Sequence, residues 1–312
     1  MSDVIFDVQA GVGRITLNRP QAINALTTAM LADIGEQLSV WADEPSVERV
    51  HLRGAGERGL CSGADVRALR ADLLERGEVV AEVFFSVEYA VDALIATYPK
   101  PIRADLFGIT MGGGLGLSAH CADRVVRADS RLAMPETIIG LFPDVGVLYE
   151  LSRVPGELGT HLALTGGTVG AHDAVLVGLA DRVEGEAPAG DLAWQRDWID
   201  ECYAGDDPLA IVQRLAEHPD PQARATAEVL RQRCPFSVAV SLAAIRRAAT
   251  LPDVASVLAQ DLVLAVPMVL RPDFAEGVRA QLVDKDRNPG WRPSRLEDVD
   301  AREVAALFAD LG

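Results

Sequence analysis

The stretch Gly108-Ile-Thr-Met-Gly-Gly-Gly-Leu-Gly116 limits what this chain can fold into more than any other part of the sequence. Glycine has no Cβ, so such a run lets one backbone segment approach another, or a ligand, closely. If the run opens a helix, several N–H groups lack an intrahelical acceptor and lie at the positive end of the helix dipole, where an oxyanion is stabilised. Tight packing of a helix on a strand is the alternative use of the same glycines.

Two acidic residues follow within a mostly apolar segment, Met134 to Gly146. We expect Glu136 to be partly buried, and burial raises the pKa of a carboxylate so that it can act as base, acid or nucleophile near neutral pH. A Glu that caps the turn or pairs with Arg131 is the structural alternative. Asp144 stands at an apparent helix start, where capping the helix is its default role.

Composition and charge limit the class of partner. The chain has 312 residues, of which 49% are hydrophobic and 24% charged, so a globular fold with a substantial core is expected. The formal net charge is −17. Nucleic acid is therefore an unexpected partner, because binding to the phosphate backbone needs a basic face. An anionic small ligand is still compatible with this charge if a few Lys and Arg residues gather in one groove.

Cysteine usage and hydropathy indicate a soluble protein from a reduced compartment. The four cysteines form no C-x-x-C pair, and the first residues lack the pattern of a signal peptide. The apolar run Leu262–Leu270 is too short to span a bilayer. We therefore expect a cytoplasmic location and no membrane partner. Five scattered histidines without a His/Cys/Asp cluster at ligand spacing predict no catalytic metal.

Hydrophobic periodicity predicts an α/β fold that becomes helical toward its end. Residues 4–18 alternate as a hairpin, and apolar residues from Asn24 onward repeat at helical spacing. Further strands are expected at 50–53, 101–107, 124–126 and 131–133, and a helix at 78–97. Strand signals nearly vanish beyond residue 150. We predict an α/β core at 1–205 and a helical region at 206–312, joined near Gly205-Asp-Asp-Pro208.

Two other local groups are candidates for function. Cys61-Ser-Gly-Ala-Asp65 is a turn of small residues suited to exposing a backbone N–H, or a tight connection capped by Asp65. His120 and Cys121 are adjacent, but neighbours on one helix point about 100° apart, so we interpret both as packing residues.

These stretches together resemble the crotonase (enoyl-CoA hydratase/isomerase) superfamily over nearly the whole chain. Within it, the chain is most similar to the 3-hydroxyisobutyryl-CoA hydrolases. The matching pieces are Ile15–Pro20 with Asn24–Leu26, Gly54–Arg67, Phe84-Phe85 with Glu88-Tyr89, Gly108–Ser118, Met134–Gly146, Asp273–Arg279 and Asp284–Arg287. The resemblance implies a spiral of ββα turns and a helical C-terminal region that covers the site or builds an oligomer interface.

The resemblance also implies the parts of a site for an acyl-CoA thioester. The backbone N–H groups of Ser62 and Gly113 would form an oxyanion hole, and loss of one such donor typically costs about 3–4 kcal/mol of transition-state stabilisation. Glu136 would attack the thioester or activate water, and Asp144 would orient a substrate hydroxyl or aid hydrolysis. The residues implied to contact substrate are Glu88, Gly63, Ala64, Asp65 and Gly112.

One position separates the activities of this superfamily. Hydratases carry a second catalytic Glu three positions after the middle glycine of the run, where this chain has Gly116. We therefore expect a 3-hydroxyacyl-CoA hydrolase of valine catabolism that uses Glu136 and Asp144. An enoyl-CoA hydratase or isomerase, and a non-catalytic acyl-CoA binding protein, are the alternatives.

The remaining expectations concern charges and assembly. Arg103 and Asp105 lie two apart on a predicted strand where relatives are apolar, so we expect them to form an ion pair with each other or with neighbours. Lys100, Arg67 and Arg70 could contact the CoA phosphates, although a solvated surface role is the default for each. No cofactor is expected, since coenzyme A belongs to the substrate. A homo-oligomer, such as a trimer or an assembly of trimers, is the expected state.

Overall fold

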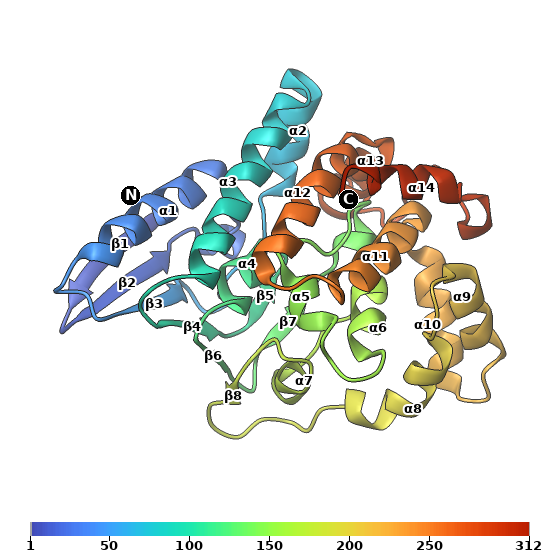
Figure 1. The fold of residues 1–312 in the computed structure, drawn as a ribbon, viewed down its shortest axis with the longest axis horizontal. Coiled ribbons are helices and arrows are strands. Elements are labelled where there is room, and N and C mark those ends of the chain that lie inside the picture. Colours follow the sequence, from blue (N-terminus) through green and yellow to red (C-terminus); the bar gives the residue numbers. More distant parts are fainter. Residues whose placement is uncertain (1, 312) are drawn as a thin grey trace.

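The computed structural model describes residues 2–311, which form a sheet-containing half and a helical half (Figure 1). The strands are β1 Val4–Gln9, β2 Val12–Leu17, β3 Arg49–Gly54, β4 Ile102–Leu106, β5 Ile109–Met111, β6 Asp123–Val126, β7 Arg131–Ala133 and β8 Arg182–Val183. The helices of the first half of the chain are α1 Thr28–Asp43, α2 Val66–Arg76, α3 Val79–Ala96, α4 Gly113–Ala119 and α5 Val147–Leu151.

Helices make up nearly all of the rest. They are α6 Leu158–Thr165, α7 Ala171–Leu176, α8 Leu192–Cys202, α9 Pro208–Glu217, α10 Pro221–Gln232, α11 Pro235–Ala248, α12 Val254–Leu270, α13 Pro272–Val278 and α14 Ala301–Leu307. Short 3-10 helices span Pro20–Ala22, Glu136–Ile138, Leu296–Asp298 and Ala309–Leu311, and a π-helical turn spans Arg279–Val283. The predicted change from mixed to helical structure after residue 150 is confirmed.

Successive chain segments are shared between two sheets, which produces a spiral. A six-stranded sheet has the order β1-β2-β3-β4-β6-β8, and a two-stranded sheet pairs β5 with β7. β1 and β2 form the predicted antiparallel hairpin, whereas the other pairs are parallel. β4 joins the large sheet and β5 the small one, and β6 with β7 repeat this arrangement. The glycine run therefore leaves the small sheet and enters α4.

Helices α1 and α3 lie over the large sheet and pack against each other (Figure 1). α1 buries Met30, Leu31, Ile34 and Leu38, as its spacing predicts. It begins at Thr28, after the Thr27 hydroxyl caps it, and not at Asn24. Asn24 has a φ of 55°, and its amide donates to the carbonyls of Ala55, Gly59 and Leu60. The helical pattern thus starts before the helix because a buried amide holds that turn in place.

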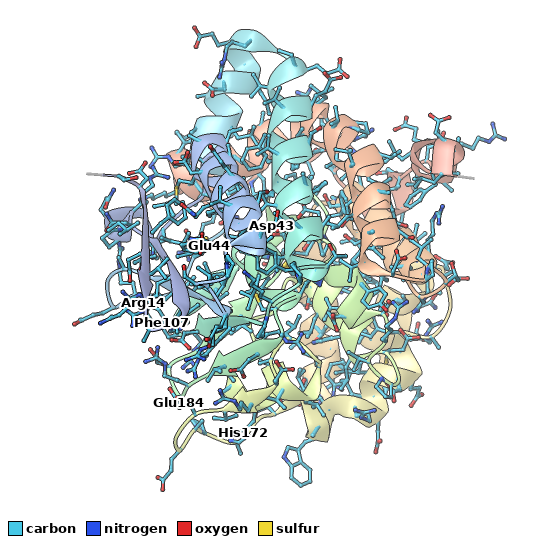
Figure 2. The ribbon with its side chains drawn as sticks, turned by 60° about the vertical axis from the view of Figure 1, so that its left-hand side comes forward. Arg14, Asp43, Glu44, Phe107, His172 and Glu184 are labelled. Atoms are coloured by element: carbon cyan, nitrogen blue, oxygen red, sulfur yellow. The ribbon has the colours of Figure 1, made fainter. Side chains whose placement is uncertain are left out.

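The opposite face of the large sheet carries charges. Arg103 Nη2 lies 2.9 Å from Asp105 Oδ1, which confirms the predicted ion pair, and His51 Nε2 and Glu184 extend it. Partial burial opposes ionisation of Asp105, but hydrogen bonds from His51 and Arg103 outweigh it and lower the pKa to about 2. Figure 2 shows Glu184, Arg14 and Phe107 on this side of the sheet, away from α1 and α3. Alternation along β4 thus separates a core face from a charged face.

The C-terminal helices pack onto the earlier part of the chain. α12 packs along α3, and α13 contacts α2. A division at residue 205 stays a prediction. Within residues 2–311, no single helix is long and apolar enough to cross a bilayer; α12 together with the bent continuation Pro272–Val283 meets that criterion by length and composition only.

Candidate active site

A largely apolar cavity of about 270 Å³ opens where α2, α3, the glycine run and α13 meet. Its polar lining consists of the acids Glu88, Glu136 and Asp144, with Ser62 and Gln281. The other lining residues are Gly63, Ala64, Val66, Leu69, Phe84, Phe85, Met111, Gly112, Gly113, Pro135, Ile138, Ile139, Leu141, Phe274 and Leu282. A concave apolar pocket with a few converging polar groups is the usual form of a small-ligand site.

Each of three glycines in the run faces a buried carboxyl group. A Cβ at Gly112 would lie 3.0 Å from Glu136 Oε1, and one at Gly113 would lie 2.4 Å from Glu88 Oε1. A Cβ at Gly116 would lie 2.8 Å from Asp92 Oδ2. Gly112 also has a φ of 51°, which favours glycine. These three positions are therefore glycines because acidic side chains occupy the adjoining space, whereas Gly108 and Gly114 lie against the backbone of Arg58 and Cys61.

The backbone donors differ from the prediction at one of two positions. The N–H of Ser62 donates to Ile23 O at 2.9 Å, so Ser62 is wrong as an oxyanion donor. Ala64 forms an isolated parallel β-bridge with Leu26. Among the described residues, the N–H of Ala64 donates no hydrogen bond. The Ala64 nitrogen is 3.6 Å from where a Cβ of Gly113 would lie. The N–H of Gly113, at the first turn of α4, has no intrahelical acceptor. Ala64 and Gly113 are therefore the available pair.

Glu136 opens the 3-10 helix Glu136–Ile138 and is 7% exposed. It does not pair with Arg131, whose guanidinium donates to Ser130 O, and its Oε2 accepts no hydrogen bond from the described residues. Burial, followed by the nearby charge of Asp144, raises the pKa of Glu136 well above its ordinary value. The carboxyl is thus desolvated and unpaired beside Gly112, as a base or nucleophile requires.

Asp144 is not a helix cap, contrary to the default expectation. α5 begins at Val147 after Gly146, and the Asp144 carboxylate turns to Tyr89 instead, whose hydroxyl donates to Oδ2 at 2.6 Å. Burial raises the pKa of Asp144 to about 6, while the Tyr89 hydrogen bond opposes that rise. Asp144 therefore keeps an ionised form accessible near neutral pH inside the cavity.

Three more buried acids surround this pair. Burial raises the pKa of Glu88, Asp92 and Asp261 well above the ordinary range, and the charge of Asp144 contributes in each case. The hydrogen bond from Tyr89 favours ionisation of Asp144 over its neighbours. When environments separate the pKa values of neighbouring carboxyls, those carboxyls divide acid and base roles between them.

Most of the other residues predicted to contact substrate line the cavity, but one does not. Gly63, Ala64, Gly112 and Glu88 line it, but Asp65 does not: its carboxylate caps α2 and pairs with Arg19 at 3.1 Å. The contact of Asp65 with substrate thus stays a prediction.

The basic and nucleophilic candidates lie outside the cavity lining. Lys100 donates to Glu44 O, Arg70 donates to Ala275 O, and Arg67 is exposed. His120 contacts Val145 O, and burial raises the pKa of Cys121 to about 12, which agrees with packing roles for both. Within residues 2–311, no three His, Cys, Asp or Glu side chains are arranged to hold a metal ion.

Tyr89, Asp92 and Asp261 were not recognised as site residues from the sequence. A signal exists in α3, where Glu88 and Asp92 lie four positions apart on one side of a mostly apolar helix. Asp261 likewise interrupts the apolar α12. Polar residues at buried positions of amphipathic helices indicate function, because burial of an unpaired acid is costly.

The family is decided by a match over most of the chain. The family model described as enoyl-CoA hydratase/isomerase matches residues 12–187 and 182–308. The chain belongs to the enoyl-CoA hydratase/isomerase family. Two relatives in this family are the mitochondrial 3-hydroxyisobutyryl-CoA hydrolases of Gallus gallus and Danio rerio. They are 34% and 36% identical, over 100% and 99% of this chain and 90% of each relative.

Two solved structures confirm the fold. A carnitinyl-CoA dehydratase from Mycobacterium thermoresistibile matches with a TM-score of 0.95 at 41% identity, covering 99% of this chain and 97% of that one. An enoyl-CoA hydratase from Rhodobacter sphaeroides 2.4.1 matches with a TM-score of 0.94 at 36% identity and the same coverage. The predicted crotonase-like α/β fold is thus confirmed, and the relatives carry names from two reaction types.

Proposed function

We propose that this protein hydrolyses the thioester of a short 3-hydroxyacyl-CoA, with 3-hydroxyisobutyryl-CoA as the first candidate. The observation that carries the proposal is that Glu136, which has no hydrogen-bond partner at Oε2, shares the cavity with free backbone N–H donors. The position of Gly116 has no room for a second acid. The names of the curated relatives support the same reaction. The cavity, at about 270 Å³, suits a short acyl group.

The reaction starts with the thioester carbonyl between the N–H groups of Ala64 and Gly113. These donors stabilise the negative charge that develops on the carbonyl oxygen when the carbon is attacked. Ionised Glu136 supplies the attack by one of two routes. It removes a proton from water, or it adds to the carbon itself and forms an anhydride that water then cleaves. In both routes the C–S bond breaks, the sulfur takes a proton, and the products are the free acid and coenzyme A.

Asp144 and Glu88 suit a hydroxyl group on the acyl chain. A hydroxyl donates one hydrogen bond and accepts others, so it is best held between an acceptor and a donor. Asp144, whose carboxylate accepts from Tyr89, supplies the acceptor. Glu88, whose pKa burial raises well above its ordinary value, supplies the donor in its protonated form. This pair favours a 3-hydroxyacyl group over an unsubstituted one.

Hydratase activity is the second candidate, because solved relatives carry that name. A hydratase divides water activation and proton delivery between two carboxylates. At Gly116 even a Cβ would lie 2.8 Å from Asp92 Oδ2 and 2.8 Å from Val145 Cβ. No acidic side chain fits there, so hydrolysis is the better match.

Release of free thiol from 3-hydroxyisobutyryl-CoA, followed with a thiol-reactive chromophore, tests the proposal. Isobutyryl-CoA serves as the control without the hydroxyl, and crotonyl-CoA as the hydratase control. Thiol release that is fastest with the hydroxylated ester supports hydrolysis. Loss of the enoyl absorbance of crotonyl-CoA without thiol release would establish a hydratase, and binding of all three esters without turnover would establish a binding protein.

Glu136→Gln tests the role of the acid within this reaction. We expect kcat to fall at least about 100-fold while the Kd for the CoA ester stays near the wild-type value, because the amide keeps the shape and loses the base. Glu75→Gln on the exposed side of α2 is the matched control. A Glu136→Gln variant with wild-type kcat would overturn the assignment. A single turnover in ¹⁸O-water separates the two routes, since only the anhydride route leaves the label in Glu136.

Assembly and compartment stay predictions. A trimer or an assembly of trimers is proposed from the resemblance alone, and sedimentation of the purified protein tests it. The cytoplasmic location and the lack of a nucleic-acid or membrane partner are proposed on charge and composition. The curated relatives named above are mitochondrial.

A further inference from the structure

The turn that carries Asp144 has an unfavourable backbone. Val147 N–H donates to Asp144 O at 3.1 Å, and both central residues have positive φ, 54° at Val145 and 72° at Gly146. Turns of this kind normally have Asn-Gly or Gly-Gly at the centre. A β-branched residue at positive φ is a genuine outlier, and such strain persists only where the surroundings impose it. Some contacts must therefore hold Val145 in this conformation.

Side chains from three separate elements hold the turn. Asp261 Oδ2, on α12, accepts the N–H of Gly146 at 2.8 Å. His120 Nε2, at the end of α4, lies 3.2 Å from Val145 O, and Tyr89 on α3 donates to Asp144 itself. A Cβ on Gly146 would lie 2.9 Å from His120 Nε2, so the ring packs directly on the turn. Hydrogen bonds thus hold the residue before Val145, Asp144, and the residue after it, Gly146.

The hydrogen bond from Gly146 N–H to Asp261 is the contact that no local feature of the sequence predicts. Asp261 is fully buried and lies 115 positions from Gly146. Its second oxygen, Oδ1, has no partner among the described residues, and no Lys or Arg pairs with it. A buried carboxyl with one hydrogen bond is expensive, so its presence calls for a compensating role. Apart from the neighbouring Gln260, the group that interacts with this carboxylate is the Gly146 N–H of the turn that carries Asp144.

We propose that Asp261 is a positioning residue for Asp144: it holds the strained Asp144–Val147 turn through the Gly146 N–H and so keeps the Asp144 carboxylate within reach of Tyr89 and of the substrate. The inference rests on the proposed function for the role of Asp144 in turnover. It means that α12, in the helical C-terminal region, sets the geometry of an acid that the glycine-run half of the chain supplies. A displacement of about 1 Å at a reacting group costs about 100-fold in rate, so one hydrogen bond can matter.

Three variants separate this role from simple packing. Asp261→Asn keeps an oxygen that can accept the Gly146 N–H, whereas Asp261→Leu fills the site without an acceptor. Met268→Leu is the matched control, because Met268 is equally buried on α12 but makes no hydrogen bond to the turn or to Asp261 among the described residues. We expect about a 10- to 100-fold loss of kcat for Asp261→Leu, little loss for Asp261→Asn, and wild-type kcat for Met268→Leu.

The pH profile of kcat provides the readout that a packing defect would not change. The titratable groups that face Asp144 are Tyr89, Glu88 and Asp92 on α3, Glu136, and Asp261 on α12; His120 faces the turn together with Glu150. When the turn relaxes and Tyr89 loses its bond, ionisation of Asp144 becomes harder. The acidic limb of the profile should therefore move to higher pH in Asp261→Leu and stay in place in Asp261→Asn.

Crystal structures of the wild type and of Asp261→Leu make the test independent of activity. A Tyr89 Oη–Asp144 Oδ2 separation beyond hydrogen-bond distance in the variant supports the proposal. An unchanged separation overturns it, and so does equal loss of kcat in the Asn and Leu variants. Wild-type turnover alone judges the proposed function, so the two failures are distinguishable. If Asp261→Leu does not fold, a loss of kcat in Asp261→Asn still contradicts the proposal.

Discussion

At the scale of single residues, the site is built from contacts between glycines and acids. Gly112, Gly113 and Gly116 each face a carboxyl oxygen at a distance that leaves no room for a side chain. The same lack of side chains leaves the N–H of Gly113 accessible to a ligand. The absence of a Cβ thus has two consequences. It leaves space for the buried carboxyl groups, and it keeps the backbone N–H of Gly113 exposed to the cavity.

Tyr89→Phe tests whether a single hydrogen bond keeps Asp144 ionisable. Burial raises the pKa of Asp144 to about 6, and the Tyr89 hydroxyl opposes that rise, so its removal should raise the pKa further. If ionised Asp144 is needed, kcat is lost as the pH falls through this pKa. The acidic limb of the kcat profile should therefore move upward by about one pH unit.

Tyr98→Phe is the control for this experiment, because the Tyr98 hydroxyl donates at 2.7 Å to Leu38 O, away from the site. It should leave the profile in place. An acidic limb that is the same in wild type and Tyr89→Phe would show that Asp144 does not control it.

At the scale of elements, α3 carries two of the buried acids, Glu88 and Asp92, and α4 carries the glycines that face them, Gly113 and Gly116. α3 presents Phe84, Phe85 and Glu88 to the cavity, and its Tyr89 and Asp92 lie behind. α4 begins with the glycine run and packs against α3. The two helices can approach closely because α4 has glycines where it faces the acidic side chains of α3.

Gly116→Ala tests this close approach. Alanine favours an isolated helix over glycine by about 1 kcal/mol, so propensity alone predicts a more stable protein. The new Cβ would instead lie 2.8 Å from both Asp92 Oδ2 and Val145 Cβ. We expect the free energy of unfolding to fall by about 1–3 kcal/mol, measured by urea denaturation.

Gly35→Ala in α1 is the comparison, because its Cβ would meet only Val91 Cγ2, at 3.2 Å. That variant should be clearly less destabilised than Gly116→Ala. Equal stabilisation of both proteins would mean that the packing around Gly116 is looser than an approach of 2.8 Å implies.

At the scale of the whole molecule, charge is distributed in two ways. Most of the −17 net charge lies on acids outside the core, but five acids are buried near the cavity, Glu88, Asp92, Glu136, Asp144 and Asp261. On the charged face of the sheet, Asp105 is instead paired and its pKa is lowered to about 2. The two groups of acids respond to pH in opposite directions.

Asp92→Asn tests this difference through stability. Burial raises the pKa of Asp92 in the folded protein above its unfolded value of 3.8, so its contribution is favourable at low pH and is lost as the pH rises toward the folded pKa. The amide removes that loss. Between about pH 4 and the folded pKa, the variant should gain stability relative to wild type by roughly 1 kcal/mol per pH unit, measured by chemical denaturation.

Asp105→Asn should behave in the opposite way. Its folded pKa is depressed, so the carboxylate stabilises the protein above pH 3.8, and this contribution is lost as the pH falls toward about 2. The variant should therefore be less stable than wild type at neutral pH. A stability difference for Asp92→Asn that does not change with pH would contradict the assignment of a raised pKa.

The sequence alone determined features that a few consecutive residues encode. The β1–β2 hairpin, the core face of α1, the alternation along β4 and the helical end of the chain follow from side-chain periodicity. The burial of Glu136 followed from its apolar neighbours. These predictions held because each depends on contacts within one or two turns of chain.

Tertiary structure decided which groups are free and which are paired. The N–H of Ser62 donates to Ile23 O and is therefore not free to bind an oxyanion. Asp144 accepts a hydrogen bond from Tyr89, 55 positions away, and does not cap a helix. Asp261 reaches Gly146 from 115 positions away. Local patterns cannot specify such pairs, because hydrogen bonding is satisfied by whichever group packing brings within about 3 Å.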